Sequence, residues 1–189
     1  MGELGLALCR VGAGDLSHVQ DLMEDATRWL RTMSTDQWAN PWPSEDARKQ
    51  RIQAAIAAGR TWIVWDGAMP VATVSASPND HEIWPPENRR DSAVYVRRLV
   101  VRRQYSGHRL GAQLLDWAGL RARRDYDARW VRVDVWRTNE KLHAYYRQQG
   151  FEFCGFCESI EDYPSSALFQ KRTDRILPPD HPLFHEELG

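Results

Sequence analysis

The sequence predicts a single α/β domain in which a mixed β-sheet is flanked by helices, and three observations support this. The 189 residues fit one domain, and a chain of this length can bury roughly 70% of its unfolded surface. Hydrophobic residues make up 42% and charged residues 27%, as is ordinary for a globular protein. Strand and helix patterns alternate along the second half. We expect one domain over residues 1–172 and a tail over 173–189.

The first half should form a strand, two helices and a hairpin. Asp15 can cap the first helix, whose apolar residues recur at helical spacing as far as Leu30. Ser44 can cap the second, which Gly59 ends, and the Asp-Gly pair at 66–67 is typical of a hairpin turn. The expected elements are a strand at 4–11, acceptor-side helices within 15–58 separated by a Trp- and Pro-rich loop at 35–43, and strands at 61–65 and 71–76.

The second half alternates strands and helices, which is typical of α/β units on a mixed sheet. A polar loop precedes it, and a Pro-rich tail that we expect to pack loosely follows it. The expected elements are a loop at 79–91, a strand at 93–101, a helix at 107–124, a strand at 130–136, a helix at 140–149, strands at 151–157 and 167–171, and the tail at 173–189.

Composition excludes several classes of protein. The net charge of -1 gives no reason to expect nucleic acid or a membrane as a partner. No run approaches 18 apolar residues, and the amino terminus lacks the pattern of a signal peptide. Three cysteines, an odd number, do not make a disulfide framework. A reducing cytoplasm is therefore the expected location.

The segment 100–115 predicts a phosphate-binding loop. A strand ends there, Gly107 follows in a short loop, and a helix begins almost at once. The first turn of a helix has unpaired N–H groups and partial positive charge, which suits a pyrophosphate. Arg103, His108 and Arg109 could add positive charge, and Gly111 would keep the first turn uncrowded. An ordinary strand-to-helix turn that contains a glycine is the alternative.

Residues 104–112, QYSGHRLGA, resemble the acyl-CoA loop of the GNAT superfamily of N-acetyltransferases, whose usual form is Gln or Arg, two residues, Gly, one residue, then Gly or Ala. Gln104 and Gly107 match, whereas Arg109 replaces the second small residue. A second block, 139–151, is similar to the family's Asn, helix, Tyr, three residues, Gly-Phe signature. The resemblance extends over roughly 62–171.

The resemblance implies a splayed mixed sheet, an acetyl-CoA-binding core at 93–157, acetyl-CoA as cosubstrate and no metal. The pantetheine arm would lie between the strands that end near Val101 and Trp136, and loop amides would hold the pyrophosphate. Asn139 would contact the cofactor or, alternatively, cap a helix. The implied cofactor-binding residues are Leu99, Val100, Val101, Gln104, Gly107, His108, Arg109, Leu110, Gly111, Ala112 and Asn139.

Tyr146 lies four residues before Gly150, where the family's general-acid tyrosine commonly lies. Its alternative is a half-buried helix tyrosine, and Tyr145 should serve packing. Many members carry a glutamate on the strand at 95–99, but this chain has no carboxylate there. Asp134 is the nearest acidic alternative as general base. It could instead pair with an arginine, and a water chain could replace a single base.

Three loop tryptophans could cover an acceptor pocket and stack on a cation, or could instead plug the edge of the core. Of these, Trp38 and Trp84 are the expected substrate-binding residues, and Trp42 is the third. Glu82 and Asp91 could line the acceptor mouth. The thiols at 154 and 157 resemble half a zinc site without a second pair, so a structural role is expected.

The expected function is N-acetylation of a primary amine by its direct attack on acetyl-CoA in a ternary complex. A small-molecule amine is favoured, because no extended peptide groove is evident in the sequence. A non-catalytic acyl-CoA-binding module and an enzyme that acts on a protein amino terminus or lysine are the alternatives. A homodimer is possible, and the sequence does not identify the amine.

Overall fold

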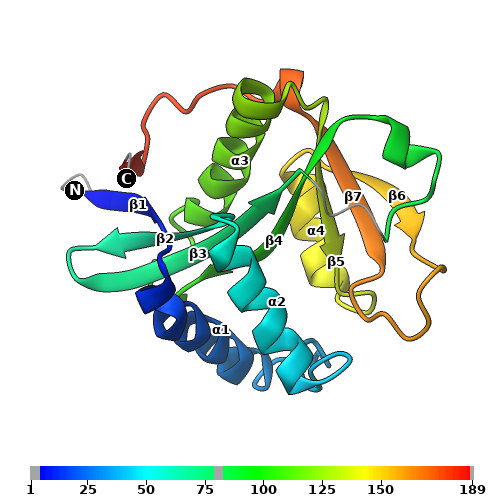
Figure 1. Ribbon diagram of the computed structural model, residues 1–189, viewed down its shortest axis with the longest axis horizontal. Helices are drawn as coiled ribbons and strands as arrows, with labels where there is room; N and C mark the ends of the chain where they lie inside the picture. Colours follow the sequence, from blue (N-terminus) through cyan, green and yellow to red (C-terminus); the bar gives the residue numbers. More distant parts are fainter. Residues whose placement is uncertain (1–4, 79–82, 188–189) are drawn as a thin grey trace.

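An eight-stranded β-sheet with helices on both faces forms the body of the protein in a computed structural model that describes residues 5–78 and 83–187 (Figure 1). The strand order is β6-β7-β5-β4-β3-β2-β1-β8. The β4–β5 and β1–β8 pairs are parallel and the other pairs are antiparallel. The bounds are β1 (Leu6–Arg10), α1 (Leu16–Leu30), α2 (Glu45–Ala57), β2 (Thr61–Asp66), β3 (Met69–Ser77), β4 (Ala93–Val101), α3 (Leu110–Tyr126), β5 (Trp130–Val135), α4 (Glu140–Gln148), β6 (Glu152–Phe156), β7 (Ala167–Arg172) and β8 (Phe184–Glu186).

The local signals for helices and turns are mostly confirmed. Ser44 caps α2, since its Oγ accepts a hydrogen bond from the Ala47 N–H at 3.2 Å. Gly59 follows the helix with a left-handed φ of +64°. Asp15 precedes α1, but its carboxylate accepts from the Gly12 N–H at 3.0 Å and does not cap the helix. Leu4, expected in the first strand, lies outside the described residues.

The two faces of the sheet carry different helices. In β2, Ile63 belongs to the cluster that α1 and α2 form with one face, whereas Trp62 and Val64 belong to the cluster that contains α3. Side chains alternate between faces along a strand, so these neighbours mark opposite sides of the sheet. Helices α1 and α2 therefore cover one face of the sheet, and α3 covers the opposite face.

The sheet is splayed at its centre, as the sequence led us to expect. Strand β4 pairs with β5 only from Ala93 to Val96, opposite Trp130 to Val133. Beyond Val96 the two strands diverge (Figure 1), and residues 97–101 pair only with β3. The β3–β4 register also shifts between Thr73 and Ser75, beside Arg98, whose φ is +51°. This bulge in β4 lies at the point where the sheet opens.

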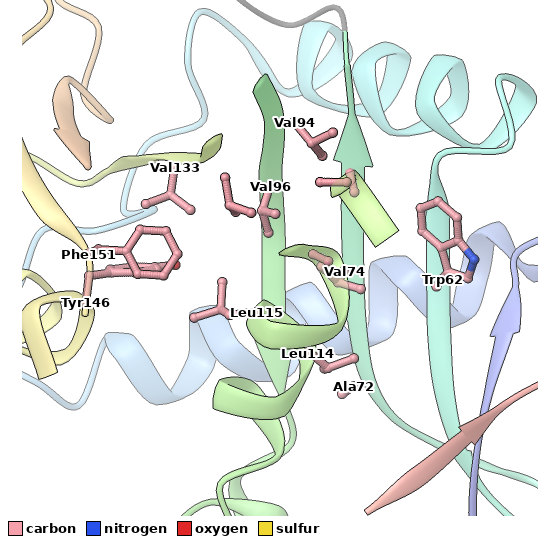
Figure 2. Packing of buried hydrophobic residues seen from close by; sticks show 14 of the residues in the cluster. Trp62, Ala72, Val74, Val94, Val96, Leu114, Leu115, Val133, Tyr146 and Phe151 are labelled. Carbon is pink, nitrogen blue, oxygen red and sulfur yellow. The ribbon is translucent and has the colours of Figure 1, made fainter. Parts of the chain in front are cut away.

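The buried core holds the open end of the sheet in place. In Figure 2, Tyr146 and Phe151 lie together at one side of the cluster, and Leu115 of α3 extends between them and the central strands. The two aromatic rings are 5.5 Å apart at an interplanar angle of 78°, an edge-to-face contact. Tyr146 is thus anchored by its ring.

The C-terminal segment is attached to the domain on both sides of an exposed stretch at 177–182, so the expectation of a loosely packed tail was wrong for its two ends. It runs past α3 and adds β8 parallel to β1 (Figure 1). Gln113 donates to the His181 carbonyl at 2.9 Å and accepts from the Leu183 N–H at 2.8 Å. Ile176 is 1% exposed, and a Cβ added to Gly119 would lie 2.2 Å from its Cδ1. Gly119 therefore makes the room in α3 into which the tail packs.

Within the described parts of the chain, no helix combines the length and the apolar character that crossing a membrane requires.

Candidate active site

Two adjoining cavities open where β4 and β5 diverge. The larger has a volume of about 860 Å³ and the smaller about 450 Å³. The larger lies against the start of α3, and the smaller lies between α2, β4 and β5. Five residues line both cavities: Gln37, Trp38, Leu99, Leu142 and Tyr146. The two spaces therefore adjoin one another at these five side chains, of which Tyr146 is one.

The larger cavity is built on the start of α3. The first bond of the helical pattern runs from the Gln113 N–H to the Arg109 carbonyl, at 3.0 Å. The amides of Leu110, Gly111 and Ala112 precede it, and all three residues line the cavity. Helix geometry gives such amides no acceptor within the helix, and the helix dipole adds partial positive charge. This end of the cavity fits a pyrophosphate, and its volume fits a cofactor-sized molecule.

The loop before α3 adopts the conformation that its glycine permits. Gly107 has a φ of +86°, in the region that favours glycine. Arg109 has a φ of +61° and a ψ of 12°, although an L-residue in this region costs about 1–2 kcal/mol. Where the motif has a small residue, this chain thus keeps a left-handed backbone and places a guanidinium at the cavity. Arg103 lines the cavity too, with its guanidinium 4.9 Å from the Trp29 ring centre.

Two expected cofactor-binding side chains lie elsewhere. Gln104 and His108 are exposed and line neither cavity, and the Gln104 amide lies 3.6 Å from the Met69 sulfur. Asn139 lines the larger cavity, but its side chain is engaged by the protein. Its Oδ1 caps α4 by accepting from the Leu142 N–H at 3.0 Å, and its Nδ2 donates to Gln37 at 2.7 Å. The helix cap, which the sequence left open as an alternative, is therefore present.

The remaining expected cofactor-binding residues line the larger cavity: Leu99, Val100, Val101, Gly107, Arg109, Leu110, Gly111 and Ala112.

Tyr146 lies at the junction of the cavities and is only 8% exposed. No described residue makes a hydrogen bond with its hydroxyl. Burial raises the pKa of Tyr146 above the ordinary phenol value, and the charges of Tyr145 and Asp134 raise it further. The hydroxyl is therefore protonated at neutral pH and can donate a proton or a hydrogen bond into either cavity.

Tyr145 packs against the core cluster, as expected from the sequence, but its place beside the larger cavity was not anticipated. It lines the larger cavity, and a Cβ added to Gly111 would lie 3.1 Å from its hydroxyl. The phenol therefore lies over the first turn of α3. Burial raises the pKa of Tyr145, and Asp116 adds to the effect. Helical spacing predicts that the two tyrosines point in different directions from α4. Only the packing of α4 beside α3 shows that both line the larger cavity.

The smaller cavity is rich in arginine. Arg48, Arg51, Arg97 and Arg98 line it. Asp134 lines it as well, and its Oδ1 lies 3.2 Å from the Arg97 Nε. The Tyr163 hydroxyl donates to the other oxygen of Asp134 at 2.5 Å. The pairing of Asp134 with an arginine, one of the two roles that the sequence left open, is thus present.

The loop tryptophans divide between the site and the core. Trp38 lines both cavities and Trp42 lines the smaller one, where its ring lies 4.9 Å from that of Tyr163. Trp84 is fully buried and lines neither cavity. The Arg132 guanidinium covers the Trp84 ring at 4.5 Å. Trp84 is therefore a core residue, contrary to the expectation that it contacts substrate.

Other side chains that the sequence singled out lie away from both cavities or cannot be placed. Asp91 accepts from the Trp130 indole at 3.3 Å and lines neither cavity. Glu82 lies outside the described residues. Cys154 and Cys157 are free thiols. In residues 5–78 and 83–187, no group of three or more His, Cys, Asp or Glu side chains is arranged to hold a metal ion.

The loop between α1 and α2 is fastened to the end of β5, which sequence reasoning did not anticipate. Asp36 accepts hydrogen bonds from the Trp136 indole at 2.9 Å and from the Thr138 hydroxyl at 2.5 Å. These bonds, that from Thr138 most, lower the pKa of the Asp36 carboxyl. They hold Gln37 and Trp38 at the boundary of the two cavities.

Comparison with known proteins agrees with this geometry. The model of the acetyltransferase (GNAT) family matches residues 23–151, more than half of the chain. A relative from Bacillus subtilis (strain 168), described as the uncharacterized N-acetyltransferase YesJ, is 27% identical over 155 residues, which cover 80% of this chain and 84% of the relative.

Solved structures share the fold. A GNAT-family acetyltransferase from Listeria monocytogenes 4b F2365 superposes with a TM-score of 0.68 at 24% identity, covering 88% of this chain and 94% of the other. PaiA N-acetyltransferase from Thermoplasma acidophilum, solved in complex with coenzyme A, superposes with a TM-score of 0.65 at 14% identity, covering 89% and 99%. The chain belongs to the acetyltransferase (GNAT) family and is an acetyl-CoA-dependent acyltransferase.

Proposed function

We propose that the protein transfers the acetyl group of acetyl-CoA to the primary amine of a small molecule, by direct attack while both substrates are bound. The meeting of the two cavities at Tyr146 carries this proposal, because it lets a cofactor and an acceptor approach one another there. A structural neighbour from Thermoplasma acidophilum was solved in complex with coenzyme A, which supports coenzyme A as a ligand of this fold.

On the cofactor side, the chain offers backbone groups and cations. The first-turn amides of α3 would hold the pyrophosphate, with Arg103 and Arg109 adding positive charge. Residues 97–101 of β4 have no strand partner on the β5 side, so their backbone can accept the pantetheine arm as an added strand. Tyr145 would bound the cofactor over Gly111.

At the junction, we assign Tyr146 the role of general acid. Acetyl transfer forms a C–N bond and breaks the C–S bond, so the departing sulfur needs a proton and the amine must lose one. The Tyr146 hydroxyl, protonated at neutral pH, lines both cavities and can supply the first proton. Trp38, which lines both cavities as well, would bound the acceptor beside the thioester.

A small acceptor fits the size of the smaller cavity, about 450 Å³. A protein amino terminus or lysine remains the alternative acceptor. A homodimer and a cytoplasmic location stay predictions from the sequence.

Acetyl-CoA should bind without any acceptor, because the amides at the start of α3 are held in place by the helix itself. Calorimetry should detect this binding, and the affinity should fall as salt rises, since phosphate contacts are screened. Release of free thiol across a panel of amines then tests transfer. Absence of binding at millimolar acetyl-CoA would contradict the assignment of the larger cavity.

For Asp134 we expect Asp134→Asn to lower kcat/KM for the acceptor but to keep the acidic limb of its pH profile. The carboxylate holds Arg97 at 3.2 Å and accepts from Tyr163, so its loss should displace those side chains. The limb should follow the pKa of the acceptor when two amines of different pKa are compared. A limb that disappears with the substitution would instead identify Asp134 as the general base, the other role that the sequence left open.

A further inference from the structure

The two cavities share a boundary that three separate segments form. The α1–α2 loop contributes Gln37 and Trp38, β4 contributes Leu99, and α4 contributes Leu142 and Tyr146. Trp38 has the largest side chain of the five, and it packs against the cluster of buried side chains from α1, α2 and the sheet. The indole is therefore supported by the core where it bounds the passage from one cavity to the other.

Trp38 occupies a backbone position that is unfavourable for tryptophan. The Ala39 N–H donates to the Asp36 carbonyl at 3.0 Å, so residues 36–39 form a turn and Trp38 is its third residue. Its φ is +60°, a value that favours Gly or Asn at this position and is an outlier for a bulky side chain. Backbone strain of this kind persists only where the surrounding structure holds it, and it is concentrated at functional sites.

The turn is held against the end of β5. The Asp36 carboxylate accepts from the Trp136 indole at 2.9 Å and from the Thr138 hydroxyl at 2.5 Å. Although Asp36 is exposed, Trp136 is only 8% exposed and gives the carboxylate a fixed donor. Gln37 accepts from the Asn139 side-chain amide at 2.7 Å. These three bonds join the loop to the segment from which α4 begins.

This attachment fixes Trp38 relative to Tyr146. Asn139 caps α4 through its Oδ1, and Tyr146 lies about two turns further along the same helix. The loop and α4 therefore share an anchor at Asn139. A wall discriminates between groups of different size only when it cannot move aside, so the bonds that hold the loop matter as much as the size of the indole.

We propose that Trp38 restricts the acyl group that the enzyme transfers to acetyl, and that Asp36 is a positioning residue that holds Trp38 in place. This inference rests on the proposed function, which puts the thioester at the boundary of the cavities, and it names the class of acyl donor. In the transfer, the amine nitrogen bonds to the acyl carbon as the C–S bond breaks. Each extra methylene of the acyl chain must therefore fit within the boundary beside Trp38.

Binding of a series of acyl-CoA molecules tests the restriction without any amine. Calorimetry compares coenzyme A, acetyl-CoA, propionyl-CoA and butyryl-CoA on the whole protein. We expect butyryl-CoA to bind about tenfold or more weakly than acetyl-CoA, with propionyl-CoA between them, since one methylene in a fitted pocket changes selectivity by about 10- to 200-fold. Turnover is the second measure: release of free thiol with butylamine, tyramine or ethanolamine should give kcat/KM values in the same order.

Tryptophan variants locate the wall. Trp38→Ala should reduce the preference for acetyl-CoA over butyryl-CoA by about tenfold. Trp38→Phe should reduce it less, because the phenyl ring fills part of the space of the indole. Trp65→Ala is the matched control, because Trp65 packs against the same buried cluster but lines neither cavity. It should keep the wild-type preference even where it lowers the melting temperature.

Aspartate variants test the positioning role. Asp36→Ala should weaken the preference for acetyl-CoA over butyryl-CoA, and Asp36→Asn, which keeps one acceptor oxygen, should retain more of it. Asp21→Ala is the control, because it removes an exposed carboxylate of α1 that lines neither cavity. A role in stability alone would change the melting temperature of the Asp36 variants and leave the ratio of the two affinities unchanged. That result would overturn the role of Asp36.

The outcomes separate this inference from the proposed function. Butyryl-CoA that binds and reacts as well as acetyl-CoA in the wild type would overturn the restriction and leave the proposed function standing. A wild-type preference that Trp38→Ala leaves unchanged would overturn the role of Trp38. An acyl-CoA preference that depends on Trp38, together with no acetylation of any amine, would support the restriction and overturn the proposed function.

Discussion

Replacing Tyr146 by Phe is expected to lower kcat by roughly 10- to 10³-fold, the range near that for loss of one general acid. The acetyl-CoA affinity should change little. The substitution keeps the ring, which packs 5.5 Å from Phe151 and 6.1 Å from Phe169, and it removes only the hydroxyl. Steady-state kinetics together with calorimetry of acetyl-CoA binding separate the two effects.

Tyrosine controls make the result specific. Tyr145→Phe should act mainly on acetyl-CoA affinity, because its hydroxyl lies over the first turn of α3. Tyr126→Phe, at a 47% exposed position that lines neither cavity, should have no effect. If Tyr146→Phe and Tyr126→Phe both leave kcat intact, the Tyr146 hydroxyl serves packing alone.

The pH dependence of the wild type adds a further check on Tyr146. Its pKa is raised by burial, so the acid form persists above the ordinary phenol pKa of about 10. Because the general acid must carry its proton, activity would be lost only as the pH rises through the raised pKa of Tyr146. We therefore expect no alkaline decline of kcat from this group up to about pH 10, the ordinary phenol value.

The second large effect should follow Gly107→Val, which we expect to weaken acetyl-CoA binding by about 10- to 100-fold. Gly107 has a φ of +86°, and a β-branched side chain disfavours that conformation. A Cβ at Gly107 would meet no atom within 4 Å, so the fold itself has room for it. The substitution should instead displace the amides of the loop and hinder the close approach of a phosphate.

Gly67→Val is the matched control for backbone strain. Gly67 has a φ of +57° at the β2–β3 turn, a Cβ there would also meet no atom within 4 Å, and it lines neither cavity. Both variants should lose a few degrees of melting temperature, at about 2–4 °C per kcal/mol for this chain length. Only Gly107→Val should lose cofactor affinity, and equal affinity in the two variants would show that the loop has another role.

Local patterns in the sequence determined the order of the elements and the position of the loop that precedes α3. The Ser44 cap, the Asp-Gly turn at 66–67 and the helix after Gly107 each depend on residues within a few positions of one another. The family signatures at 104–112 and 139–151 then indicated a splayed sheet, and the β4–β5 divergence confirmed it. Interactions between residues only a few positions apart can be inferred from a single sequence.

Long-range packing decided the rest. The arginines of the smaller cavity come from α2 and β4, and Asp134 comes from β5, so only the folded chain brings them together. Trp84 was expected at the substrate, but the guanidinium of Arg132 covers it in the core. The tail was expected to be loose, yet it gains a strand because β1 offers a free edge and Gly119 makes room for Ile176. Composition and spacing cannot specify such contacts, because they depend on which distant surfaces the fold places side by side.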